Sequence, residues 1–258
     1  MADPSPLWEV LAAEAGAPSL ERVLTELCRR GGLLGLAAAQ DLPALRRALG
    51  PAQQRLALPS QGAALVVGSG GSSGGRRWCL QPLAHLEASA IATGAWLRSV
   101  GLEPSTALLV NPLPWHHVSG LMPWLRSRVW GARHGWLTPA QLRLPEALSA
   151  TCPLPPRGTA LLSLVPTQLH RLLAHPAGVR WLQGFDLIWV GGAALSASDA
   201  ARSREAGLRL APCYGSTETG SMVAALAPER FLAGESGCGA CLPHAELRLQ
   251  PDTGAVEV

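Results

Sequence analysis

Residues 208–220 read Leu-Arg-Leu-Ala-Pro-Cys-Tyr-Gly-Ser-Thr-Glu-Thr-Gly, a largely apolar run that passes directly into a polar turn. The run from Leu208 to Ala211 is typical of a short strand. The turn from Tyr214 to Gly220 gathers hydroxyls, a carboxylate and two glycines. Because open α/β sheets bind ligands at the carboxyl ends of their strands, this turn predicts a ligand site.

Strand and helix patterns alternate along most of the chain. Further strands are expected at 63–67, 107–110, 160–165 and 187–190, and helices at about 82–100, beyond Gly120, at 168–173 and at 198–206. This alternation predicts an α/β fold with a largely parallel sheet covered by helices on both faces. Helical spacing in Leu7–Ala15 and Leu20–Leu27 predicts helices in the first sixty residues, and Ala245–Leu249 and Ala255–Val258 predict a hairpin.

Composition excludes several classes of protein. The hydrophobic fraction of 48% against 15% charged residues is that of a packed globule. The net charge of +3 is small and the arginines are scattered, so a nucleic-acid interface is not expected. No apolar run is long enough to cross a bilayer, and residues 1–6 lack the start of a secretion signal. A cytoplasmic protein without a membrane span is therefore expected.

Cysteine and lysine usage limits the chemistry further. The six cysteines are expected to be free thiols, and Cys238 and Cys241 form a CxxC that lacks the second ligand pair of a zinc site. The chain contains no lysine. A reaction step that needs a lysine amine therefore cannot be performed by this chain alone.

A glycine- and serine-rich stretch, Gly68 to Arg77, follows the apolar run that ends at Val67. Glycines allow backbone amides to turn inward, hydroxyls add donors and arginine neutralises negative charge, so the stretch predicts a polyphosphate loop. A Walker loop is discounted, because Arg76-Arg77 stands where lysine and then serine or threonine are required.

Two other interpretations of this stretch stay open. Gly71-Ser72-Ser73-Gly74-Gly75 satisfies the GxSxG pattern of a hydrolase, with Ser73 as nucleophile and Asp186 or Asp199 and His244 as partners. The stretch could also be a plain flexible surface loop.

Together with two later motifs, the stretch resembles the superfamily of acyl-CoA synthetases, adenylation domains and luciferases. Ser69 to Arg77 matches its phosphate loop, and Tyr214 to Glu218 matches its YGxTE signature without a mismatch. Pro114-Trp-His-His-Val-Ser-Gly120, Val165-Pro-Thr-Gln-Leu169 and Gly191-Gly-Ala-Ala-Leu195 are similar to o-succinylbenzoate:CoA ligases of menaquinone and phylloquinone synthesis. The resemblance covers roughly residues 60 to 258. It implies the layered αβα large N-terminal domain of acyl-adenylate-forming enzymes.

The resemblance also implies a reaction and its participants. The carboxylate of a small-molecule acid attacks the α-phosphorus of ATP, pyrophosphate leaves, and the thiol of CoA then displaces AMP. The residues implied for the phosphates are Ser69, Gly70, Gly71, Ser72, Ser73, Gly74 and Arg77, the last in the family's lysine position. Those implied for adenine are Tyr214, Gly215, Gly191, Gly192 and Ala193.

Three residues are implied to be catalytic. Thr217 would donate to the α-phosphate, Glu218 would hold Mg²⁺, and His117 would shape the pocket for the acid.

The sequence departs from the family pattern in several places. The segment 1–60 is expected to be an abbreviated helical part, and 61–258 the AMP-binding domain, ending inside the hairpin. The family continues beyond this point to a TGD motif and a mobile lid domain with an adenylation lysine. An incomplete large domain without its lid is therefore expected, with activity of this chain alone in doubt. A nucleotide-binding remnant without catalysis is the remaining alternative, and the sequence does not fix the oligomeric state.

Overall fold

Five strands form the parallel part of the larger sheet in the computed structural model, which describes residues 7–12, 17–53, 62–69, 77–250 and 256–258. These strands are β5 (Leu108–Asn111), β6 (Arg133–Trp136), β7 (Ala160–Leu164), β8 (Leu187–Val190) and β9 (Leu210–Ser216). Two antiparallel strands extend the sheet, β10 (Ser221–Ala225) and β11 (Ala240–Cys241), which gives the order β11-β10-β9-β8-β7-β5-β6. The predicted parallel sheet is confirmed, and its antiparallel extension was not predicted.

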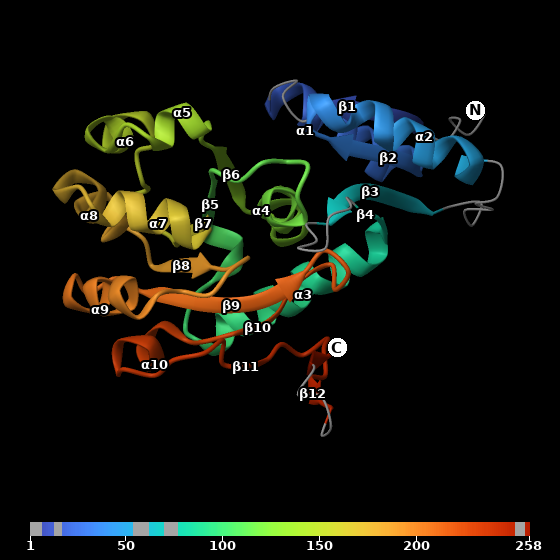
Figure 1. Cartoon of the computed structure of the whole chain (residues 1–258). Coiled ribbons are helices and arrows are strands. Elements are labelled where there is room, and N and C mark those ends of the chain that lie inside the picture. The colour runs from blue at the N-terminus through green and yellow to red at the C-terminus, as the bar shows by residue number, and fades with distance from the viewer. Residues whose placement is uncertain (1–6, 13–16, 54–61, 70–76, 251–255) are drawn as a thin grey trace.

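Helices cover both faces of this sheet (Figure 1). The helices of the larger sheet are α3 (Leu83–Ser99), α4 (Val118–Trp130), α5 (Pro139–Leu142), α6 (Leu148–Thr151), α7 (Pro166–Leu173), α8 (Pro176–Leu182), α9 (Ala197–Glu205) and α10 (Pro228–Leu232). Successive residues of β7 point to opposite faces, because Leu162 packs in a cluster with α7 and α8 whereas Leu161 packs with Leu97 of α3. The α/β fold expected from the sequence is therefore confirmed.

A smaller sheet is formed by β1 (Leu7–Ala12), β2 (Gly32–Ala37), β3 (Ala63–Ser69) and β4 (Arg77–Pro82), in that order. Its first three strands are parallel, and β4 returns antiparallel to β3. Helices α1 (Ala17–Arg30) and α2 (Leu42–Gln53) connect the parallel strands. A short 3₁₀ turn at Ala39–Asp41 precedes α2, and similar turns lie in the rest of the described chain at Pro104–Thr106 and Pro145–Ala147.

The predicted helix over Leu7–Ala15 is wrong. Residues Leu7–Ala12 form β1, which pairs with β2 over six residues from Leu7–Gly32 to Ala12–Ala37. Tertiary strand pairing overrides the weak helical spacing of so short a segment. The helix over Leu20–Leu27 is confirmed within α1. The described part of the first sixty residues therefore holds two strands beside helices α1 and α2, and a boundary at residue 60 falls between the paired strands β2 and β3.

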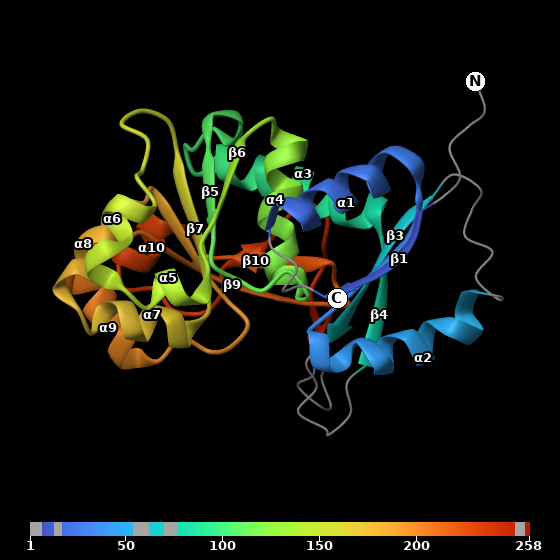
Figure 2. The same cartoon turned by 90° about the horizontal axis from the view of Figure 1, so that it is seen from above.

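The two sheets share helices and a core. Leu36 of β2 and Leu65 of β3 belong to one buried cluster with Leu86 of α3 and Leu121 of α4. Figure 2 shows α3 and α4 lying between the smaller and the larger sheet. The first strands of the chain are thus packed, through these helices, against the sheet that carries the motif at 214–220.

The hairpin near the end of the chain is confirmed with shorter strands. β12 (Arg248–Leu249) pairs antiparallel with β13 (Val256–Glu257). Among the described residues, no helix has the length and apolar character to cross a bilayer.

The packing of β2 can be tested by substitution. Leu36 is completely buried, so Leu36→Ala should lower the free energy of unfolding by about 2–5 kcal/mol, through lost burial and a residual cavity. Urea titration followed by circular dichroism measures this. Ile91→Ala, at a side chain that is 61% exposed, is the control and should change stability by less than about 0.5 kcal/mol. An equally small effect of Leu36→Ala would show that β2 is not part of the core.

Candidate active site

The carboxyl ends of three parallel strands place sequence motifs at one edge of the larger sheet. β5 leads into the loop that carries His117, β8 into Gly191 and Gly192, and β9 into Thr217 and Glu218. Since adjacent parallel strands end at the same edge, the structure brings these loops together as expected.

The turn after β9 is held in one shape by its own side chains. Thr219 Oγ1 accepts a hydrogen bond from the backbone N–H of Ser216 at 2.9 Å and donates to the carbonyl of Ser221 at 2.7 Å. A Cβ at Gly215 would lie 2.1 Å from the Ser221 carbonyl oxygen, so any larger residue would push the two strands apart. Small residues here follow from the close approach of β9 and β10.

Gln81 of β4 joins this turn to the smaller sheet. Its side chain is only 4% exposed, and Nε2 donates to the carbonyl of Thr217 at 2.5 Å and to that of Glu218 at 3.3 Å. These bonds link positions 136 and 137 residues apart in the chain. The turn therefore has a fixed place relative to β3 and β4.

The Glu218 side chain lies beside the end of β3 and the start of β4. A hydrogen bond from its own backbone N–H lowers the pKa of its carboxyl most, and bonds from Ser216 and Ser69 and the charge of Arg77 lower it further, against the opposing effect of burial. Ser69 ends β3 and Arg77 begins β4. Glu218 is thus an ionised carboxylate that accepts from hydroxyls and lies within the field of the Arg77 charge.

Part of the predicted phosphate loop lies outside the described residues. Gly70, Gly71, Ser72, Ser73 and Gly74 fall within 70–76. The two described residues that flank this stretch, Ser69 and Arg77, are both close enough to Glu218 to lower its pKa. The predicted loop therefore joins the described chain at the side of the predicted magnesium ligand.

The residues predicted for adenine flank the same edge. Tyr214, a large aromatic side chain, is 41% exposed. A Cβ at Gly191 would meet Cys213 Sγ at 2.7 Å, so the backbone at Gly191 runs close to the residue before Tyr214. Gly192 has a φ of 83°, a conformation that favours glycine, and both it and Ala193 are exposed.

His117 and Thr217 have different surroundings. His117 is half-buried at the start of α4, and its ring lies 4.4 Å from the ring of His116. The side-chain hydroxyl of Thr217 makes no hydrogen bond to the residues that the structure describes, although its backbone carbonyl is well satisfied. That hydroxyl could serve as a donor to a ligand.

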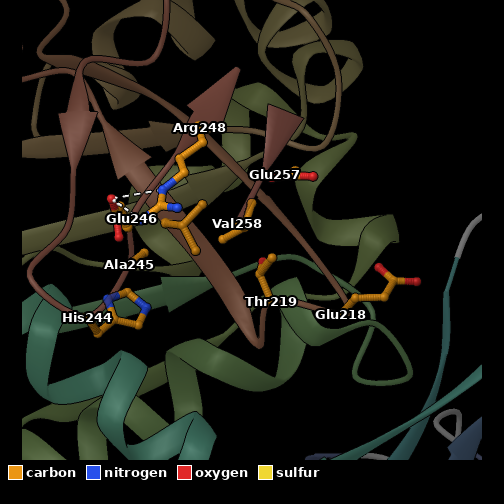
Figure 3. Close-up of a pocket in the computed structure, with 9 residues that line it drawn as sticks. Glu218, Thr219, His244, Ala245, Glu246, Arg248, Glu257 and Val258 are labelled. Atoms are coloured by element: carbon orange, nitrogen blue, oxygen red, sulfur yellow. Dashed lines mark hydrogen bonds and ion pairs between the residues drawn. The ribbon is translucent and has the colours of Figure 1, made fainter. Parts of the chain in front are cut away.

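A cavity of about 420 Å³ opens beside this turn (Figure 3). Glu218 and Thr219 line it on one side, and His244 and the C-terminal hairpin line it on the other. Arg248 of the hairpin pairs with Glu246 at 3.0 Å within the lining.

The sequence model of the AMP-binding enzyme family matches residues 80–257. The chain belongs to this family. The 2-succinylbenzoate–CoA ligase of Geobacillus sp. (strain WCH70) is 25% identical over 189 residues, which are 73% of this chain and 37% of that protein. The match thus spans little more than a third of the length of that relative.

Two solved enzymes of the family share the fold. The o-succinylbenzoate-CoA synthetase (MenE) of Bacillus subtilis in complex with ATP and magnesium ion aligns with a TM-score of 0.60 at 19% identity, over 96% of this chain and 52% of that one. Wild-type E. coli MenE, bound to an analogue of OSB-AMS, aligns with a TM-score of 0.66 at 22% identity, over 92% and 54%. The chain spans about half of each, and the expected fold of the family's large domain is confirmed.

Arg126 of α4 was missed in the sequence. It is 4% exposed, its Nη2 donates to Ser221 Oγ at 3.1 Å, and its guanidinium carbon lies 5.2 Å from the centre of the Trp189 ring. Its Nε has no hydrogen-bond partner among the described residues, and burial lowers its pKa to about 10. The available signal was one charged residue directly after the apolar run Leu121–Leu125 of a helix.

The charge of Arg126 acts on a residue that lines the cavity. Burial lowers the pKa of His244, which lines the cavity, and the charge of Arg126 lowers it further. Ser221, the partner of Arg126, has a φ of 125° and directly follows the family's turn. Few non-glycine residues adopt such a backbone, and strain of this kind is commonly kept at ligand sites.

The hydrolase interpretation receives no support from the described partners. Asp199 Oδ1 lies 3.0 Å from His170 Nδ1, and Asp186 accepts the backbone N–H of Ala160 at 2.7 Å. Neither aspartate is hydrogen-bonded to His244 in the part of the chain that the structure describes, and Ser73 lies outside that part. Both aspartates therefore have structural partners instead of a catalytic one.

The residues at this edge fit a magnesium–nucleotide complex. No group of three or more histidine, cysteine, aspartate or glutamate side chains that could hold a metal occurs in the described ranges. Mg²⁺ bound with a nucleotide needs only one or two carboxylates, since phosphate oxygens and water complete its shell. The single ionised Glu218, next to Arg77, matches this requirement, and its role as a metal ligand stays a prediction.

The link between Gln81 and the turn can be tested by Gln81→Leu. This substitution leaves buried carbonyls without their donor and should lower the free energy of unfolding by about 1–3 kcal/mol. Hydrogen exchange at residues 216–220 should also accelerate. Gln183→Leu is a matched control, because exposed Gln183 also donates to a carbonyl, that of Ala206 at 2.9 Å; its effect should stay below about 0.5 kcal/mol. Equal effects of the two variants would contradict the account.

The charge of Glu218 gives a pH-dependent difference. Because its folded-state pKa is lowered, the ionised carboxylate contributes stability that is present above its ordinary value of 4.5 and is lost as the pH falls through the folded-state pKa. The stability advantage of the wild type over Glu218→Gln should therefore be constant near neutral pH and shrink in acid. Parallel urea titrations across this range measure it, and a difference that does not vary with pH would rule out the lowered pKa.

Proposed function

We propose that the chain forms the ATP- and acid-binding part of an enzyme that activates o-succinylbenzoate as an acyl-adenylate and transfers the acyl group to CoA, in menaquinone or phylloquinone synthesis. The observation that carries the proposal is the grouping of Glu218, Ser69 and Arg77 at the edge where Thr217 and Tyr214 also lie. Membership of the AMP-binding enzymes and the name of the Geobacillus relative support it.

The proposed step requires the negative charge on the phosphate oxygens to be stabilised. As the acid carboxylate attacks the α-phosphorus, a bond to its oxygen forms and the bond to pyrophosphate breaks. Thr217, whose hydroxyl has no described partner, would donate to the α-phosphate, and Arg77 would neutralise charge on the departing phosphates. Mg²⁺ held by Glu218 would shield the β- and γ-phosphates when bound.

Adenine would be held by shape more than by charge. Tyr214 offers an exposed ring for stacking on adenine. Gly191, Gly192 and Ala193 have small or no side chains, so their backbone can lie close to the base. Gly215 keeps β9 and β10 close enough for Tyr214 to occupy its place.

Arg126 favours an acid with two carboxylates. A buried guanidinium without an anionic partner is costly, because the protein replaces its hydration incompletely. Its described hydrogen-bond partner is the neutral hydroxyl of Ser221. o-Succinylbenzoate has one carboxylate to be activated and a second that stays charged, and the second could pair with Arg126. His117 would then border the acid from the β5 side.

A pair of acyl-adenylate analogues tests this proposal through binding, which needs no lysine. One is the sulfamate analogue of o-succinylbenzoyl-adenylate, and the other lacks the free carboxylate. Calorimetry should show the first binding at least about tenfold more tightly to the wild type, since a buried charge-assisted pair contributes about 1.5–3 kcal/mol. Arg126→Leu should abolish the difference.

Arg128→Leu is the control, because Arg128 is exposed two residues further along the same helix. It should preserve the preference for the free carboxylate. If the wild type binds neither analogue, the proposed function is wrong and the nucleotide-binding remnant is favoured. If it binds both equally, the assignment of the acid is wrong.

A further inference from the structure

Asn111, the last residue of β5, holds both ends of the loop that carries His117. Its side chain is completely buried, Oδ1 accepts from the backbone N–H of Leu113 at 3.1 Å, and Nδ2 donates to the carbonyl of Gly120 at 2.7 Å. A backbone N–H needs an acceptor and a carbonyl needs a donor, so these two groups fix which way the amide points.

The fixed amide also determines the proton position on His134. Asn111 Nδ2 lies 3.3 Å from His134 Nε2. Because an amide nitrogen can only donate, Nε2 must be the accepting nitrogen, and the ring proton must be on Nδ1. Nδ1 lies 3.0 Å from Glu21 Oε1 in α1, which accepts that proton.

The surroundings keep His134 in this form. The side chain is 6% exposed, and Trp115 of the loop packs edge-on against it with 5.5 Å between ring centres. Burial lowers the pKa of His134, while the hydrogen bond and charge of Glu21 oppose that effect. A second ring proton on Nε2 would face the NH₂ of Asn111, so the neutral ring is the compatible one.

The loop between the two anchors is closed tightly. The backbone N–H of His117 donates to the Pro114 carbonyl at 3.1 Å, and a Cβ on Gly120 would lie 2.1 Å from the same oxygen. The position of the Gly120 carbonyl therefore limits where His117 can lie, and Asn111 sets that position.

We propose that Asn111 and His134 are positioning residues. Together with Glu21 of helix α1, they hold the loop Leu113–Gly120 in place at the acid site. The link from this loop to acid binding rests on the proposed function, whereas the hydrogen-bond chain itself does not. Helix α1 would thus shape the acid site without touching the ligand.

Nitrogen NMR of the full chain tests the chain of hydrogen bonds independently of any ligand. The His134 ring, assigned by its loss in His134→Gln, should show a protonated Nδ1 and an unprotonated Nε2. In Asn111→Leu the ring should lose this single form and show mixed proton positions. A dominant Nε2–H form in the wild type would overturn the proposal.

Binding of the o-succinylbenzoyl-adenylate analogue tests the consequence. His134→Phe, which cannot accept from Asn111, should weaken binding about tenfold, whereas His134→Gln should stay within about twofold of the wild type, because its amide can both accept and donate. MgATP affinity should be unchanged in both, since neither variant alters the phosphate or adenine residues. Equal losses in both variants, or losses of MgATP affinity as well, would indicate a merely structural role and overturn the positioning claim.

The two failures are distinguishable. If the wild type does not bind the analogue although His134 shows the expected proton position, the proposed function fails and the hydrogen-bond chain stands. If the analogue binds tightly but His134→Phe has no effect on it, the proposed function stands and the positioning claim fails.

Discussion

The candidate site depends on one junction, the hydrogen bonds from Gln81 to the carbonyls of Thr217 and Glu218. Gln81 belongs to the smaller sheet and the turn belongs to the larger one, so a buried amide fixes the two parts of the site relative to each other. Buried polar groups are costly when unpaired, which makes such a junction specific as well as stabilising. Together with the core that the two sheets share, it places Ser69 and Arg77 beside Glu218.

Charge is arranged around this junction in a consistent way. Arg77 lies next to the ionised Glu218, and Arg126 is buried with the neutral hydroxyl of Ser221 as its partner. The carboxylate of Glu218 and these two guanidinium groups suit a substrate pair of a metal-bound polyphosphate and a second anion. The absence of lysine leaves these roles to arginine, whose planar fork binds carboxylate and phosphate oxygens in pairs.

Sequence patterns predicted those elements whose conformation is decided by their own residues. Short apolar runs predicted β3, β5, β7, β8 and part of β9, because strands buried on both faces need continuous apolar side chains. The strand β1 was missed since its pairing with β2, and not its own spacing, decides its conformation. The glycine-containing turn at 214–220 lies at the end of β9, as predicted, and its role as a ligand site stays a prediction. Gln81 and Asn111 could not be found, because each gains its role only from a partner brought close by the fold, whereas Arg126 left one signal, a charge directly after an apolar run.

A calorimetric titration of MgATP into the folded wild-type chain tests the central claim most directly. Binding at one saturable site, weakened at least about tenfold when Arg77 is replaced by leucine, is the expected result for a triphosphate held between Arg77, Ser69 and Glu218. A titration without measurable heat, into protein whose circular dichroism and cooperative unfolding show that it is folded, would contradict the account.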